Sequence, residues 1–147
     1  MNDKADPQTT EQLNALSQKY DEALNKNDAV ALVANFTEDV AVFVTDTGPI
    51  YGRKAIEKWY ADAFQQWHPK NMLSKPDQDS PHITGTTGNE VWSNGEWSQT
   101  LYDPNGDPIH VKGYWGAVAV LEDDEWRFRM LTWNITPAPA VPSWRPA

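Results

Sequence analysis

The segment EVWSNGEWSQTLYDPNGDPIHVKGYWGAVAVLEDDEWRFRMLTWNIT, residues 90–136, predicts the fold of this chain. It divides into three long stretches, 90–102, 109–121 and 126–136, that are rich in β-branched and aromatic residues. The sequences DPNG and EDDE lie between the stretches and are typical of tight turns. Three long strands joined in series by short turns predict an antiparallel meander.

The residues before the meander have the periodicity of helices. Thr9 followed by Gln12 is a capping-box pattern, and apolar residues then recur at helical spacing up to Asn27. Asp28 is suited to cap a short second helix over residues 29–35. A third helix is predicted over residues 53–67, because its apolar residues follow the 3.6-residue repeat: Ile56, Trp59, Tyr60, Ala63, Phe64 and Trp67.

The remaining segments complete a single α+β domain. Residues 40–45 alternate as a strand does, and the polar, proline-containing residues 70–88 predict a loop that leads into an edge strand near 82–86. We expect an N-terminal arm over 1–8, a domain over 9–136 and an extended proline-rich tail over 137–147. Helices followed by a meander predict a curved, cone-shaped antiparallel sheet wrapped around the N-terminal helices.

Composition excludes several classes of function. The chain has 147 residues, no cysteine and a net charge of -9, which repels nucleic acids and anionic membrane surfaces. The N-terminal sequence MNDKADPQTTEQ lacks the apolar core of a signal peptide, so we expect a cytoplasmic protein. The three histidines are scattered, unlike the closely spaced ligands of a zinc site, and we expect no metal.

Four strings in order resemble the SnoaL-like branch of the nuclear transport factor 2-like superfamily. They are DEALNKNDAVALVANFTEDVAVF, GPIYGRKAIEKWYADAF, NEVWSNGEWSQTLYDPNGDP and DEWRFRMLTWN. The resemblance covers roughly residues 9–136. It implies a cone-shaped α+β barrel with a pocket between the helices and the concave sheet, frequent dimerisation through the sheet, and no required cofactor.

The resembling family includes isomerases, polyketide cyclases, dehydratases and epoxide hydrolases, in which a carboxylate or histidine in an apolar pocket moves a proton. Asp46 follows the strand 40–45 and is our candidate base, although alignment with ketosteroid isomerases puts Val44 at the position of the base. The alternative role for Asp46 is that of a turn residue. Tyr20 and Tyr60 lie on the apolar stripes of their helices and are candidates to orient a substrate carbonyl, or else belong to the core.

The candidates for ligand contact are mostly aromatic: Trp59, Phe64, Trp97, Gln99, Trp115 and Asn134. Asn134 could equally close the end of its strand. Gln99 shares strand parity with Trp97, so it faces the ligand if the Trp97 side of the strand is concave. Strand parity also predicts that Trp126 fills the core. Trp133 falls on the opposite parity and should lie on the outer sheet face or in a dimer contact, unless a bulge reverses the parity.

These observations predict a pocket that binds a small hydrophobic molecule in a homodimeric protein. The bound molecule could undergo acid–base isomerase, cyclase or dehydratase chemistry. Two alternatives stay open, a non-catalytic ligand-binding protein and a dimeric association module. One scaffold hosts many activities, so the sequence does not choose among them.

Overall fold

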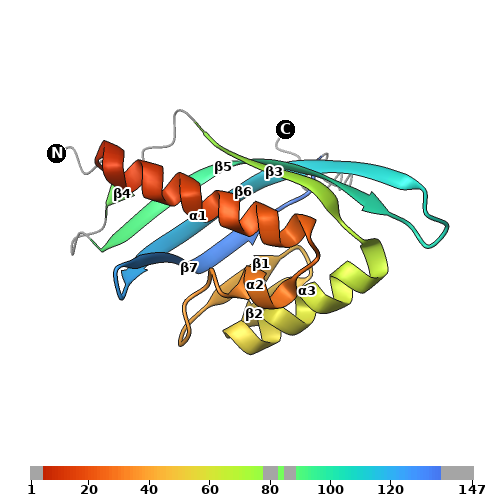
Figure 1. Cartoon of the computed structure of the whole chain (residues 1–147), viewed down its shortest axis with the longest axis horizontal. Coiled ribbons are helices and arrows are strands. Elements are labelled where there is room, and N and C mark those ends of the chain that lie inside the picture. Colours follow the sequence, from red (N-terminus) through yellow and green to blue (C-terminus); the bar gives the residue numbers. More distant parts are fainter. Residues whose placement is uncertain (1–4, 78–82, 85–88, 137–147) are drawn as a thin grey trace, which may run out of the picture.

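The computed structural model describes residues 5–77, 83–84 and 89–136. In this part of the chain three helices and seven strands form one α+β domain (Figure 1). The helices are α1 (Pro7–Asn25), α2 (Ala29–Val33) and α3 (Arg53–Trp67). The strands are β1 (Val42–Thr45), β2 (Gly48–Tyr51), β3 (Lys70–Pro76), β4 (Ile83–Thr84), β5 (Glu90–Tyr102), β6 (Pro108–Glu122) and β7 (Glu125–Trp133).

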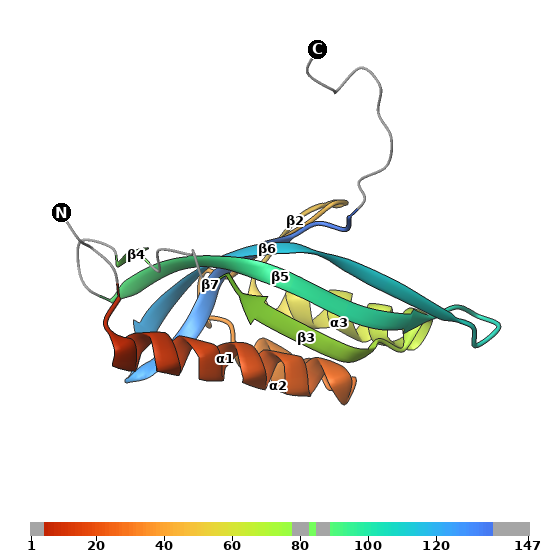
Figure 2. The same ribbon diagram turned by 90° about the horizontal axis from the view of Figure 1, so that it is seen from above.

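The strands form one curved sheet in the order β2-β1-β7-β6-β5-β3, and β4 pairs with β5. The predicted meander is confirmed as β5, β6 and β7, and the helices cover one face of the sheet (Figure 2). The sheet is mixed, because β1 pairs with β7 in parallel. No tight turn joins these two strands, so nothing in their connection requires the antiparallel pairing that we expected. None of the helices in the described ranges is long and apolar enough to cross a membrane.

The three helices form where their periodicity predicts, with corrections at the ends. Helix α3 has the predicted bounds, and Asp28 caps α2 by accepting the Ala31 N–H at 3.0 Å. Helix α1 begins at Pro7, inside the expected arm, and its cap is Asp6, which accepts the Thr9 N–H at 2.7 Å. The capping box at Thr9 was therefore wrong, because Asp6, an acceptor followed by proline, caps the helix three residues earlier.

The polar segment 70–88 was wrongly expected to begin as a loop, since residues 70–76 form strand β3. Strand β2, in the glycine-containing segment after β1, was also missed. Of the predicted edge strand near 82–86, residues 83–84 form β4, and the others lie outside the described residues. The predicted tail 137–147 also lies outside them.

Side chains of α1 form hydrogen bonds with backbone groups along the free edge of β3. The Asp21 carboxylate accepts the Ser74 N–H at 2.8 Å and the Ser74 hydroxyl at 2.7 Å. The Asn25 side chain accepts the Met72 N–H at 2.6 Å and donates to the Met72 carbonyl at 3.2 Å. Four residues rise about 6 Å along a helix and two residues about 6.6 Å along a strand. The helix spacing therefore matches the strand spacing, and α1 holds this edge as a neighbouring strand would.

A bulge in β7 places Trp133 on the concave side of the sheet. Val118 pairs with Met130, whereas the next residue of β6, Ala119, pairs with Phe128. Arg129 is therefore the extra residue, and side chains on either side of it change parity. The outer-face position expected for Trp133 is wrong, although a bulge was the stated exception. Trp126, the expected core filler, is only partly buried against the core and donates its indole N–H to Gln12 at 2.9 Å.

Two glycines make room for two tryptophans on the same concave face. Gly113 pairs with Trp97, and Gly95 pairs with Trp115 on the same two strands. A Cβ at Gly113 would lie 1.7 Å from the Asn134 carbonyl oxygen, and one at Gly95 would lie 2.7 Å from the Trp115 ring. Each indole therefore needs a partner without a side chain on the opposite strand.

We predict that Gly113→Ala lowers the free energy of unfolding by about 1–3 kcal/mol, because backbone must move to admit the methyl group. Gly116→Ala is the matched control on the same strand, since its Cβ would meet Thr132 Cγ2 at an ordinary 3.6 Å. Urea denaturation of both variants measures the difference. Equal stabilities of the two variants would contradict the close approach at Gly113.

Candidate functional site

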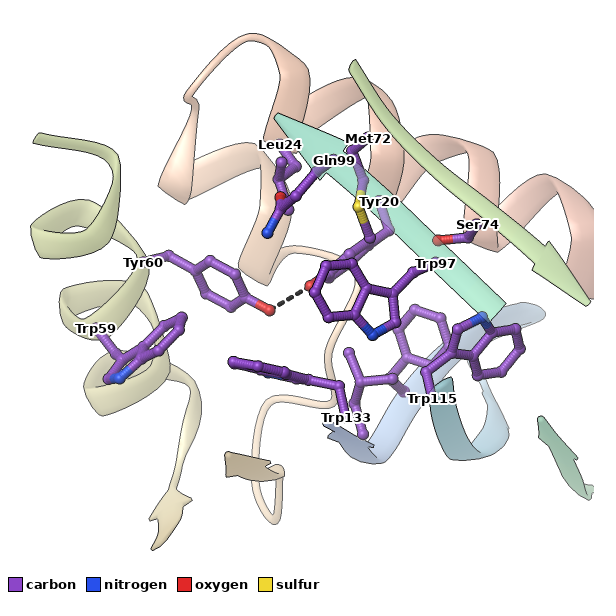
Figure 3. A pocket seen from close by; sticks show the side chains of 12 residues that line it. Tyr20, Leu24, Trp59, Tyr60, Met72, Ser74, Trp97, Gln99, Trp115 and Trp133 are labelled. Atoms are coloured by element: carbon purple, nitrogen blue, oxygen red, sulfur yellow. Dashed lines mark hydrogen bonds between the residues drawn. The ribbon is translucent and has the colours of Figure 1, made fainter. Parts of the chain in front are cut away.

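Two adjoining chambers lie between the helices and the concave face of the sheet, and Figure 3 shows the side chains that line the inner one. The inner chamber has a volume of about 70 Å³ and the outer chamber about 480 Å³. Five residues line both chambers: Leu24, Trp59, Tyr60, Gln99 and Trp133. Seven more line the inner chamber alone: Tyr20, Met72, Ser74, Trp97, Trp115, Phe128 and Leu131.

Four indoles form much of the inner wall. Trp97 and Trp133 meet edge to face with their ring centroids 5.6 Å apart, and Trp59 lies 6.3 Å from Trp133 on its other side. The Trp115 indole donates to the Glu96 carbonyl at 3.1 Å, whereas the buried Trp97 Nε1 has no hydrogen-bond partner among the described residues. Sequence parity missed Trp133 because only the bulge in β7 turns it inward.

The hydroxyl groups of Tyr20 and Tyr60 contact each other through a hydrogen bond at this wall (Figure 3). Both side chains are buried, and burial raises the pKa of each hydroxyl well above its ordinary value of 10.0. Both tyrosines therefore stay protonated at neutral pH. The pair has two protons and uses one between its oxygens, so the second is free for donation to an oxygen atom in the chamber.

A buried carboxylate lies on the far side of Ser74 from the inner chamber. Asp21 is 9% exposed, and both of its oxygens accept hydrogen bonds from Ser74, which lines the chamber. Burial raises the pKa of the Asp21 carboxyl above 3.8, and the two hydrogen bonds from Ser74 oppose the rise. Our sequence analysis missed this pair. Helical spacing was a usable signal, since Asp21 lies four residues after buried Ser17 and three before Leu24.

Most of the expected ligand contacts line the two chambers. Trp97 and Trp115 line the inner one, Phe64 lines the outer one, and Trp59 and Gln99 line both. The Trp97 side of β5 is therefore the concave side. Gln99 Oε1 is buried and has no hydrogen-bond partner in the described part of the chain.

The sequence left two roles open for Asn134, a ligand contact and the closure of a strand end, and the structure places it at the strand end. Its side chain is exposed, and its Oδ1 accepts the Tyr114 N–H at 2.9 Å, while its own N–H donates to the Tyr114 carbonyl at 3.1 Å. These bonds extend the pairing of β6 beyond the end of β7. Asn134 lines neither chamber, because its polar groups already serve the sheet.

Asp46 lies in the turn between β1 and β2 and lines the outer chamber. It is exposed and has no hydrogen-bond or ion-pair partner among the described residues. Asp46 is therefore a turn residue, and the hydrogen bond within the turn comes from its neighbour Thr45, whose Oγ1 accepts the Thr47 N–H at 3.1 Å. Asp46 and Tyr60 line the same chamber, while Tyr20 lines the inner one.

The lining carries no positive charge. Among the described residues that line the two chambers, none is a lysine, arginine or histidine, whereas Asp46 and Asp62 line the outer chamber. Asp62 pairs with Lys58 at 2.9 Å. The described ranges also contain no group of three or more histidine, aspartate or glutamate side chains that could hold a metal ion. The chambers are suited to neutral molecules and disfavour anions.

Residues 17–129 match the SnoaL-like domain family, and this range contains the tyrosine pair, Asp21 and most of the lining. The chain belongs to the SnoaL-like family. In this SnoaL-like chain the two chambers lie between α1, α3 and the concave sheet. A comparison with curated proteins gives no match.

Solved structures share this SnoaL-like fold at low sequence identity. A nuclear transport factor 2-like superfamily protein from Salmonella enterica has a TM-score of 0.78 at 17% identity, covering 96% of this chain and 100% of that one. A ketosteroid isomerase-like protein from Erwinia carotovora atroseptica has a TM-score of 0.75 at 14% identity, with 91% and 100% covered. A cystatin-like protein of unknown function from Nostoc punctiforme has a TM-score of 0.68 at 11% identity, with 92% and 96% covered.

We predict that Asp21→Asn changes how stability depends on pH. The folded protein holds the Asp21 proton more tightly than the unfolded chain, so the wild type loses stability from this group as pH rises through the window above 3.8. Asparagine does not titrate. The free energy of unfolding of the variant minus that of the wild type should therefore increase with pH in this window.

Urea denaturation at a series of pH values measures this difference. Asp62→Asn is the control, because Asp62 is exposed and paired with Lys58 at the surface. A difference for Asp21→Asn that decreases as pH rises would contradict the raised pKa of Asp21.

Proposed function

We propose that this protein binds a small, planar, uncharged molecule in the two chambers. The observation that carries the proposal is the buried Tyr20–Tyr60 hydroxyl pair in a wall of four indoles. The outer chamber is within the roughly 300–1,000 Å³ of typical ligand pockets. The inner chamber is smaller and has room for one end of a ligand.

The polar atoms of the wall support a ligand that carries oxygen. The tyrosine pair has one proton free for donation, which suits a carbonyl or hydroxyl oxygen. Trp97 Nε1 and Gln99 Oε1 are buried without a partner among the described residues, and such atoms cost free energy until a partner reaches them. A mostly apolar lining with a few unpaired polar atoms is the usual composition of a small-molecule site.

Binding is better supported than catalysis. Acid–base chemistry would use Asp46 as base and Tyr60 as proton donor, because both line the outer chamber. A catalytic base must be held against the reacting atom, and Asp46 is exposed in a turn with no described side chain to fix it. Binding requires only the shape, the indoles and the hydroxyl pair, all of which the fold holds in place.

We predict that 2-acetylnaphthalene, a planar ketone, binds the wild type and that Trp59→Leu weakens the binding about threefold to tenfold. Loss of an aromatic contact from both chambers is worth roughly 0.5–1.5 kcal/mol. Isothermal titration calorimetry measures both dissociation constants. Trp92→Leu, on the outer face, should bind as the wild type does. No heat of binding and no rise in the unfolding temperature of the wild type would refute the proposed function.

We further propose that the outer face of the sheet forms a homodimer. Strand pairing places five apolar side chains in one row across β5, β6, β7, β1 and β2: Trp92, Val118, Met130, Val42 and Tyr51. Trp92 is 56% exposed and Tyr51 69% exposed. Exposed apolar rows of this kind support an interface between protein molecules, and a second copy offers a matching one.

We predict that Val118→Glu, in the middle of this row, converts the dimer to a monomer. Burying a carboxylate against its own copy in a two-fold interface costs several kcal/mol. Light scattering coupled to size-exclusion chromatography measures the mass. Lys112→Glu is a control for added negative charge on the same strand. A wild-type protein that stays monomeric at high concentration would contradict the proposed dimer.

A further inference from the structure

Ser74 presents a hydrogen-bond acceptor to the inner chamber. Its N–H and its hydroxyl both donate to the Asp21 carboxylate, at 2.8 Å and 2.7 Å. An ionised carboxylate only accepts hydrogen bonds, so the hydroxyl proton of Ser74 must point toward Asp21. The lone pairs of Ser74 Oγ are then left for the chamber that Ser74 lines (Figure 3). Sequence analysis assigned no role to either residue.

We infer that the ligand carries a hydroxyl or amino group that donates a hydrogen bond to Ser74 Oγ at the inner end of the cavity. Asp21 is the positioning residue, because it fixes the direction of the Ser74 proton without touching the ligand. This inference rests on the proposed function and deepens it. Besides Trp97 Nε1 and Gln99 Oε1, the inner chamber then has the donor of the Tyr20–Tyr60 pair and the complementary acceptor of Ser74.

The surroundings of Asp21 favour a proton donor over an anion. Asp21 is buried, its carboxylate oxygens accept hydrogen bonds from Ser74 alone among the described residues, and the described lining has no cationic side chain. A ligand carboxylate or phosphate at Ser74 would be repelled by the lone pairs of Ser74 Oγ and by the negative charge of Asp21. A hydroxyl or amino proton at the same point is attracted by both.

Asparagine at position 21 turns the Ser74 hydroxyl from a hydrogen-bond acceptor into a donor toward the chamber, with little change in the shape of the side chain at position 21. Its Oδ1 can still accept the Ser74 N–H, while its Nδ2 donates to Ser74 Oγ. The Ser74 proton is then released toward the chamber, where Ser74 becomes a donor. Ser74→Ala removes the acceptor altogether. The two variants therefore abolish the same preference by different physical routes.

The test compares 2-naphthol, which donates a hydrogen bond, with 2-methoxynaphthalene, which only accepts. Isothermal titration calorimetry on the full chain gives the ratio of their dissociation constants. The wild type should bind 2-naphthol about threefold to tenfold more tightly, as expected for one hydrogen bond. This preference should fall to about one in both Asp21→Asn and Ser74→Ala. Ser98→Ala, an exposed serine on the outer face of β5, should keep the wild-type ratio.

The outcomes separate this inference from the proposed function. Equal affinities of the wild type for the two probes would overturn the inference while leaving the binding site in place. A preference for 2-naphthol that persists in both Asp21→Asn and Ser74→Ala would also overturn it, because the donor would then be recognised elsewhere. Failure of the wild type to bind either naphthalene, or 2-acetylnaphthalene, would refute the proposed function itself.

Discussion

The hydrogen bonds between α1 and β3 are the interaction on which the cavity depends. Asp21 and Asn25 occupy one face of the helix, four residues apart, and bind Ser74 and Met72 of the strand edge. An unpaired edge would be a site for association with another chain. Here the helix covers that edge, and the same contact places α1 across the concave side of the sheet. The inner chamber lies next to this contact. Tyr20 from the helix and Ser74 from the strand both line it.

The sheet contributes the opposite wall through two local irregularities. The bulge at Arg129 turns Trp133 inward, and Gly113 gives the Trp97 indole room on the neighbouring strand. The bulge disrupts regular strand pairing, and the glycine gives up side-chain packing in its strand. Both increase the aromatic surface around the chambers. The cavity is therefore apolar because of its indoles, and it carries a few polar atoms. In our proposal these polar atoms select the ligand.

The periodicity of the chain determined the elements and their order. The helix over residues 53–67 and the meander after residue 89 were predicted correctly, because in each the burial of one face repeats along a continuous segment. The same periodicity identified Tyr20 and Tyr60 as inward residues, and both are buried, whereas it left the face of Trp97 open. Asp28 was identified as a cap for the same kind of reason, since a cap depends only on residues two or three positions away.

Tertiary structure alone decided the features that depend on distant partners. Strand β3 is polar and ends in proline, and it is a strand because β5 and the side chains of α1 pair with it. The inward position of Trp133 follows from a bulge that the parity of its own strand does not reveal. The sequence left a ligand contact and a strand-end role open for Asn134, and its pairing with Tyr114 is seen only in the folded chain. Local spacing fixes which face a side chain takes within an element, but the partner that it meets is set only when separate elements pack together.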